Sequence, residues 1–220
     1  MLMKRRLPFL IAIVCCIEIL IYLWSVWTST FEWGNFFAIQ SEFVFDKCAR
    51  LSGRISSILI LITLSMVGYY GLRKIYADDD KRNSLLILIT LFSCNHLIHL
   101  LFVILRFRSH GQSINLNLYE PIHIGGTVHG VITFASIIII PLILWSYKHL
   151  NKLLYFLIIL HLLNISTFIV KTFLSKIKLP DNPAYHNQLG VVVITAACFF
   201  VLYRVYIENK RNSTEVRPKN

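Results

Sequence analysis

The stretch from Ser84 to Leu105 reads SLLILITLFSCNHLIHLLFVIL and contains no Asp, Glu, Lys or Arg. An apolar run of this length is typical of a helix that spans roughly 30 Å of hydrocarbon. The run also contains two histidines, His96 and His99, between wholly apolar flanks. The stretch therefore predicts a membrane-spanning helix that carries imidazole groups near its middle.

The rest of the chain repeats this pattern of apolar segments. Of the 220 residues, 56% are hydrophobic and only 15% are charged, and the mean hydropathy is +0.63. Since a backbone in lipid must satisfy its own hydrogen bonds, every span should be a helix. We predict an all-α, polytopic membrane protein, with a six-transmembrane-helix bundle in residues 1–208 and a polar, disordered cytoplasmic tail at 209–220. The predicted spans are residues 7–27, 55–72, 84–105, 122–146, 153–170 and 189–203.

The net charge of +11 could indicate a nucleic-acid partner, but the basic residues sit in short clusters at the ends of the apolar segments. Such clusters determine topology. With the N-terminus inside, counting along the chain gives 14 of the 22 Lys and Arg residues on the inner side and 8 on the outer side. We therefore predict an N-in, C-in protein of the cell (inner or plasma) membrane that contacts membrane lipid and no nucleic acid.

The five cysteines indicate no covalent framework. Cys15, Cys16, Cys94 and Cys198 lie in apolar segments, and Cys48 is predicted to lie in a polar loop. Because the chain has no CxxC pair, a disulfide scaffold, a zinc ribbon and covalently attached haem all lack support. The first apolar run exceeds a signal-peptide core and has no small-residue cleavage site, so we interpret it as an uncleaved first span.

Ionisable groups inside a bilayer are costly, and they are therefore informative. From a rise of about 1.5 Å per residue, His96 and His161 lie about 2 Å and about 1 Å from the midpoints of their spans. His99 and His129 both lie about 7 Å toward the outer face. The four histidines thus form two layers, and each layer draws on two different helices.

Two interpretations of these polar groups stay open at this point. Imidazoles on facing helices of a bundle can hold a haem iron, or they can simply form interhelical hydrogen bonds to Ser, Thr or backbone. Gly125, Gly126 and Gly130 indicate either close helix packing or room for a flat ring beside His129. Glu18, in the first span, is either a hydrogen-bond partner or a contact for a proton or a quinone.

The ordered set of motifs resembles the ferric-reductase-like transmembrane family, over roughly residues 50 to 170. The motifs are Arg50-Leu51-Ser52-Gly53-Arg54 at the start of the second span, Asn95-His96-Leu97-Ile98-His99-Leu100 in the third, Gly125-Gly126 and Pro141-Leu142 in the fourth, and Trp145 followed by Leu160-His161. Members, including the membrane partner of periplasmic methionine sulfoxide reductase, pass electrons across the membrane through b-type haem.

The resemblance implies axial ligands on the third and fifth helices, which correspond here to His96 (or His99) and His161. The chain departs from the family pattern at three places. Asn151 stands where the first histidine of the fifth helix is expected, and the second would fall at Asn164, one helical turn after His161. Arg82 and Asn83 replace any ligand at the inner end of the third span. We therefore expect one haem b per chain and no inner haem.

The predicted function is membrane electron transfer, as the haem-binding membrane component of an oxidoreductase. The predicted cofactor-binding residues are His96, His99, His129 and His161, with His96 and His161 as the ligands of the haem iron. Since the chain has no flavin or nicotinamide domain, the donor would be a quinol or a separate flavoprotein or reductase partner. One rival is a non-haem protein whose polar core serves transport or metal passage, and another is an assembly subunit. The polar core of the transport rival would contain Glu18, Asn95, His99, His129, Asn164 and Ser166.

Overall fold

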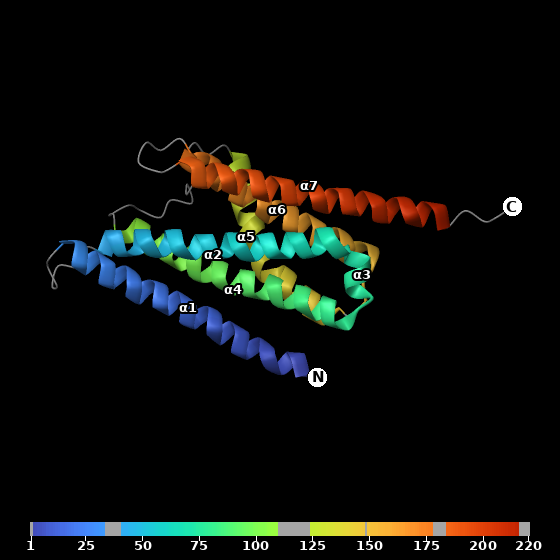
Figure 1. Cartoon of the computed structure of the whole chain (residues 1–220), viewed down its shortest axis with the longest axis horizontal. Coiled ribbons are helices and arrows are strands. Elements are labelled where there is room, and N and C mark those ends of the chain that lie inside the picture. The colour runs from blue at the N-terminus through green and yellow to red at the C-terminus, as the bar shows by residue number, and fades with distance from the viewer. Residues whose placement is uncertain (1, 34–40, 110–123, 148, 178–183, 216–220) are drawn as a thin grey trace. The chain divides into compact units, whose positions relative to one another are not determined.

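The computed structural model of the chain describes residues 2–33, 41–109, 124–147, 149–177 and 184–215. All regular structure in these ranges is α-helical, as the sequence predicts. Figure 1 labels the helices, which are α1 (Leu2–Trp33), α2 (Ser41–Tyr70), α3 (Leu72–Tyr76), α4 (Asp79–Ser109), α5 (Ile124–Ser146), α6 (Lys152–Ile177) and α7 (Ala184–Glu215).

Five of these helices, α1, α2, α4, α6 and α7, are long and apolar enough to cross a membrane. In α5 the described apolar stretch, Gly130–Ser146, is shorter. The predicted fourth span begins at residue 122, and residues 122–123 lie outside the described residues. The lengths and composition of the helices are those of a multi-pass membrane protein.

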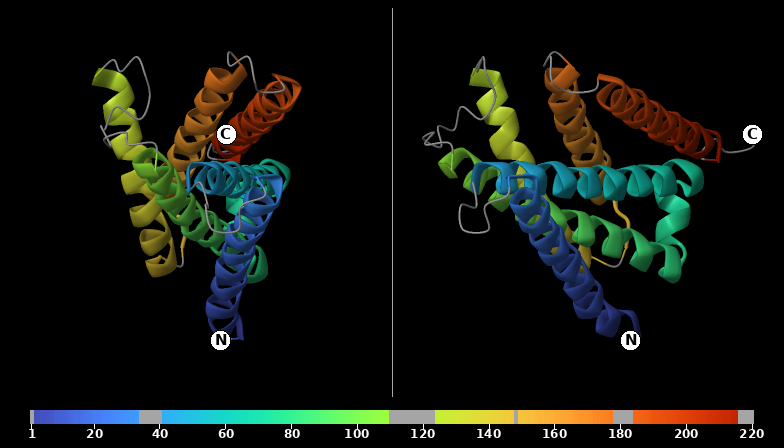
Figure 2. Two further views of the ribbon diagram at one scale, coloured as in Figure 1. Left: turned by 90° about the vertical axis from the view of Figure 1, so that its left-hand side faces the viewer. Right: turned by 60° about the vertical axis from the view of Figure 1, so that its left-hand side comes forward.

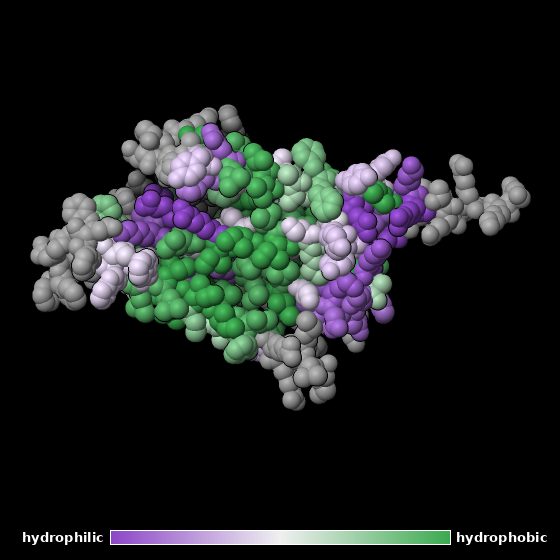
Figure 3. Space-filling model, in the orientation of Figure 1, coloured by the Kyte–Doolittle hydropathy of each residue, from purple (hydrophilic) through white to green (hydrophobic). Residues whose placement is uncertain are grey.

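Helix α1 shows which of its faces meets lipid. Its Trp24 and Trp27 side chains are 61% and 63% exposed, whereas Glu18 is 2% exposed and Ser25 and Ser29 are buried. Figure 3 shows the corresponding hydrophobic surface over α1. A helix of a soluble domain buries its apolar face and exposes its polar one. The reverse arrangement in α1 suits a helix that is surrounded by hydrocarbon.

Helix α2 begins at Ser41, well before Ile55, where the predicted second span begins. The hydropathy pattern predicts a loop for the charged residues before Ile55. In the structure Asp46 forms an ion pair with Arg50, one turn later on α2, and another with Arg106 on α4. Because these charges are paired, the helix continues through the charged segment, and the predicted loop is wrong.

The opposite face of the same segment is apolar. Cys48, which the sequence places in a polar loop, is fully buried in a hydrophobic cluster with Val44, Ala49 and Phe102. The segment therefore combines buried apolar residues with charged residues that are half-buried or exposed. The average hydropathy of its residues does not distinguish such a helical segment from a loop.

Helices α2, α4 and α7 begin or end at positions that differ from the predicted spans. The predicted second span runs to Leu72, but α2 ends at Tyr70 because Gly71 adopts a φ of 80°, which favours glycine. Asp78 caps α4, since its Oδ1 accepts the backbone N–H groups of Asp80 and Lys81, both at 3.1 Å. Helix α7 continues to Glu215, so residues 209–215 of the predicted disordered tail are helical.

The chain divides into two compact units, which are described separately. The first contains residues 1–59 and 89–131, and the second contains residues 60–88 and 132–220. The first unit therefore combines α1 with residues 41–59 of α2, residues 89–109 of α4 and the beginning of α5. Figure 2 shows α1 inclined to α2 in this unit. Most of α5 and all of α6 and α7 belong to the second unit.

Candidate functional site

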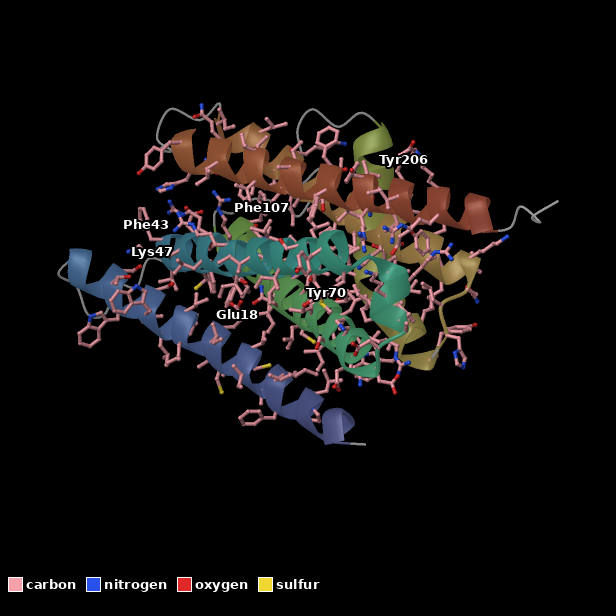
Figure 4. All side chains as sticks on the ribbon, turned by 45° about the vertical axis from the view of Figure 1, so that its right-hand side comes forward. Glu18, Phe43, Lys47, Tyr70, Phe107 and Tyr206 are labelled. Atoms are coloured by element: carbon pink, nitrogen blue, oxygen red, sulfur yellow. The ribbon has the colours of Figure 1, made fainter. Side chains whose placement is uncertain are left out.

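The first unit contains a buried carboxyl group on α1. Glu18 Oε1 accepts a hydrogen bond from the Ser52 hydroxyl of α2 at 2.8 Å. The other oxygen, Oε2, is buried and has no hydrogen-bond partner among the described residues. Figure 4 labels Glu18, which lies on the side of α1 that faces α2. The hydrogen bond links α1 to α2 within apolar surroundings, where no Lys or Arg of the described residues pairs with Glu18.

Asn95 of α4 extends this cluster along α2. Its amide Nδ2 donates to the Ser52 carbonyl oxygen at 3.2 Å and to the Ser56 hydroxyl at 2.8 Å. Its Oδ1 is buried without a hydrogen-bond partner among the residues that the structure describes. Because Ser52 and Ser56 are four residues apart, they share one helix face, and Asn95 bridges them.

His96 packs next to Asn95 on the same stretch of α4. Its Nδ1 lies 3.2 Å from Ser56 Oγ, and its ring stacks on Phe92 at a centroid distance of 5.3 Å. A hydroxyl oxygen has two lone pairs. Ser56 Oγ therefore contacts Asn95 and His96 at the same time and joins both side chains of α4 to α2.

His99 lies one turn further along α4, with its ring centroid 5.3 Å from that of His96. A Cβ at Gly53 of α2 would lie only 3.0 Å from His99 Cε1. The glycine therefore gives the imidazole room against the backbone of α2. This contact gives a physical reason for the glycine in the Arg50–Arg54 motif, which in the sequence is only a mark of the family resemblance.

In the second unit His161 of α6 meets α5. His161 is 3% exposed, and its Nδ1 lies 3.1 Å from the Ser136 hydroxyl oxygen. That hydroxyl donates its single hydrogen to the Thr133 carbonyl oxygen at 2.8 Å. Ser136 can then only accept from His161, so neutral His161 carries its proton on Nδ1. Its Nε2 keeps a free lone pair and is buried with no hydrogen-bond partner among the described residues.

A second polar pair lies one turn away on the same two helices. Asn164 Nδ2 donates to Thr133 Oγ1 at 2.9 Å. Thr133 and Ser136 are spaced by three residues on α5, as are His161 and Asn164 on α6. The two pairs therefore stack as neighbouring contacts along one helix interface.

The four predicted histidines are distributed over different parts of the molecule. His96 and His99 belong to the first unit, and His161 belongs to the second. His129 lies in α5, but its side chain lies outside the described residues. The pairing of His96 with His161 therefore stays a prediction, as does the outer layer of His99 and His129. Among the described residues no group of three or more His, Cys, Asp or Glu side chains could hold a metal ion.

Asn151, which stands at a ligand position of the resembling family, has a structural role. Its Oδ1 accepts the backbone N–H of Leu154 at 2.7 Å, which caps the first turn of α6. Arg82 pairs with Asp79 at 2.9 Å. Neither side chain is an imidazole, so neither adds to the candidate ligands.

Sequence reasoning missed the hydroxyl partners of the histidines and one buried cluster near the end of α7. The hydroxyl partners lie at helical spacing, and this spacing was the available signal in the sequence. They are Ser52, Ser56, Thr133 and Ser136.

In the second unit Tyr155 donates to Glu208 at 2.9 Å. Arg204, which the charge pattern marks only as a topology signal, donates to the Tyr70 carbonyl oxygen at 2.8 Å. It thereby satisfies a backbone acceptor at the end of α2.

No protein-family model matches the sequence, and no curated protein or solved structure does. The geometry of the two polar clusters is therefore the basis on which a function can be proposed.

Proposed function

We propose that this chain is a membrane electron-transfer protein that holds one b-type haem in a six-span, N-in, C-in helical bundle. His96 and His161 would be the axial ligands, and His99 and His129 would lie near the ring. The electron donor would be a quinol or a separate flavoprotein or reductase, and the membrane would be the inner or plasma membrane.

The observation that carries this proposal is the set of contacts around the two ring nitrogens of His161. Ser136 holds the proton on Nδ1, and the lone pair of Nε2 is left buried without a partner among the described residues. Histidines that bind metals usually donate their other ring N–H to a fixed acceptor, which sets the tautomer and the ring orientation. A buried acceptor with no donor is costly. An iron ligated by Nε2 would remove that cost, so the residues fit the group.

The surroundings of His96 also support the proposal. Ser56 Oγ lies 3.2 Å from Nδ1 of His96, and the imidazole ring stacks on Phe92. Held by two imidazoles, a haem iron would have no open position for oxygen, and the group would supply one-electron transfer. The chain's own part is to hold both rings in apolar surroundings and, at His161, to keep the proton on Nδ1.

The number of haems follows from the residues that occupy the other family positions. Asn151 is engaged as the cap of α6, and Arg82 is engaged with Asp79. Amide and guanidinium groups are poor iron ligands, so the proposal is limited to a single haem.

A redox titration of the purified full-length protein tests the proposal. We expect a low-spin, bis-imidazole absorption spectrum that changes in one one-electron step. Ser136→Ala should retain the haem and shift its midpoint potential, because Nδ1 loses its acceptor and the ligand loses basicity. Ser146→Ala is a matched control, since the Ser146 hydroxyl bonds only the Leu142 carbonyl among the described residues and is exposed. A protein without any visible absorption would contradict the proposal.

The second candidate function is a transport protein without haem. The cluster of Glu18, Ser52, Asn95 and Ser56 favours it, because buried polar groups inside a membrane commonly mark an ion or substrate pathway. The same absorption spectrum separates the two candidates, since only the first contains a chromophore.

A further inference from the structure

Glu18 is the buried carboxyl group of the first unit, and the electron-transfer proposal does not use it. It is 2% exposed, and only one of its two oxygens has a hydrogen-bond donor among the described residues. A carboxylate that is taken out of water without a counter-charge is very costly. A single serine hydroxyl offsets only a small part of that cost.

A cavity lies beside this carboxyl group. It has a volume of about 260 Å³ and is lined by residues of α1 and α4. The lining residues are Cys15, Glu18, Ile19, Tyr22, Ile98 and Phe102. Since most of these side chains are apolar, a small apolar molecule can reach Glu18 from the lipid more readily than a hydrated ion can.

The titratable groups next to Glu18 are thiols and a phenol rather than ammonium or guanidinium groups. They are Cys15 and Tyr22 on α1, which line the same cavity, and Cys48 on α2. No Lys or Arg forms an ion pair with Glu18 in the part of the chain that the structure describes. A proton on the Glu18 carboxylate would therefore neutralise its charge.

We propose that Glu18 is an intramembrane proton-binding site, in which Ser52 fixes Oε1 and the proton is carried on Oε2. The step is a simple association, in which the carboxylate takes up one proton and becomes a neutral carboxylic acid. No electron is transferred and no other bond changes. The cavity lies beside the Glu18 side chain, and Oε2 itself is buried. The proposal does not depend on haem.

Labelling with dicyclohexylcarbodiimide tests the site on the full-length protein in detergent and in lipid vesicles. This apolar reagent adds to a protonated carboxyl group and leaves a stable N-acylurea, which peptide mass spectrometry locates. We expect Glu18 to be labelled, with a yield that falls as the pH rises and the proton is lost. A water-soluble carbodiimide should label the exposed Asp79 instead and leave Glu18 unmodified.

Two variants make the test specific. Glu18→Gln keeps the size of the side chain and should lose the label at this position. Ser52→Ala keeps the carboxyl group but removes the donor to Oε1. Its labelling should persist to more alkaline pH, because the carboxylate loses the hydrogen bond that stabilises it.

Either of two results would overturn the proposal. One is a Glu18 that stays unlabelled at every pH while other carboxyl groups of the same sample react. The other is labelling that is independent of pH and equal in wild type and Ser52→Ala.

Discussion

Ser136 determines which nitrogen of His161 carries the proton, because its own hydrogen is already donated to the Thr133 carbonyl oxygen. Ser56 has a similar position next to His96. In both places a small hydroxyl group on a neighbouring helix contacts Nδ1, and it does so without placing a charge beside the imidazole. Each imidazole is thus held by a residue that does not stand out in the sequence.

The ligand assignment predicts different results for two histidines. His161→Ala should abolish the low-spin haem spectrum, whereas His129→Ala should retain bound haem, since the resembling family takes no ligand from that helix. Insertion into the membrane should persist in both, because Ala has a high helix propensity. Visible spectra of the two purified variants provide the measurement. The exposed His186 offers a matched control, and His186→Ala should be spectrally identical to wild type.

The reverse outcome would identify a different site. Loss of haem from His129→Ala, with haem retained in His161→Ala, would assign the ligands to the outer layer of His99 and His129.

Among single residues, the histidines, Asn95 and Glu18 could be predicted from the sequence, because polar groups in apolar runs are conspicuous. Ser52 and Ser136 could not be predicted as their partners. Serine is common in membrane helices and is only weakly penalised there, so its presence alone carries little information. Only the structure shows on which face of its helix each serine lies.

The helices differ from their predicted spans mainly at their ends. Helix α2 extends back to Ser41 because Asp46 pairs with Arg50 and Arg106, and α7 extends to Glu215. A hydropathy pattern detects the part of a helix that crosses hydrocarbon, and it does not detect polar turns that continue the same helix. The sequence therefore predicts the apolar centres of the spans better than their ends.

The break between α2 and α3 yields a prediction about one glycine. Gly71→Ala should destabilise the protein by about 1–3 kcal/mol, because alanine would have to adopt a φ near 80°. Its Cβ would also collide with the Glu208 carboxyl group. Thermal unfolding in detergent measures the loss. Gly130→Ala is the matched control, since a Cβ there meets no heavy atom within 4 Å among the described residues.

Gly130→Ala should be neutral or stabilising, by up to about 1 kcal/mol, because alanine favours the interior of a helix. Equal unfolding temperatures for wild type and Gly71→Ala would show that the positive φ does not hold in solution.

The cap of α4 predicts a dependence on acid. The hydrogen bond from the Lys81 ammonium group, and then that from the Lys81 backbone N–H, lower the pKa of the Asp78 carboxyl group below its usual 3.8. A lowered folded-state pKa means that the stabilisation is present above the ordinary value and is lost as the pH falls through the folded-state value. The difference in unfolding temperature between wild type and Asp78→Asn should therefore disappear in acid.

The comparison runs from neutral pH to about pH 3, where a free Asp is largely protonated. Because the other carboxyl groups titrate in both proteins, their contribution cancels in the difference. A difference that is unchanged across this range would show that Asp78 carries no stabilising charge.

Across the full chain, the structure describes two units, and the proposed ligands His96 and His161 belong to different ones. Helix rise gives the depth of a residue along its own span, which is why the sequence predicts that these two histidines lie at one level. Depth does not determine the direction in which a side chain points. The sequence could therefore not predict which helices pack against each other, or which histidines face each other.

The positions of the basic residues predict the topology. The bias of 14 to 8 favours both termini inside. A reporter that functions only in the cytoplasm should be active when it is fused after Asn220 and silent when it is inserted near Gly111. Activity near Gly111 with silence at Asn220 would invert the arrangement.

The haem content of the purified full-length protein decides whether the proposed cofactor is present. A pyridine-haemochrome assay, set against the protein concentration from amino-acid analysis, gives the number of b-type haems per chain. We predict a ratio near one, because His96 and His161 would form a single ligand pair and Asn151 and Arg82 have other roles. A ratio near zero in protein that is folded and inserted would refute the haem proposal, and a ratio near two would refute the single site.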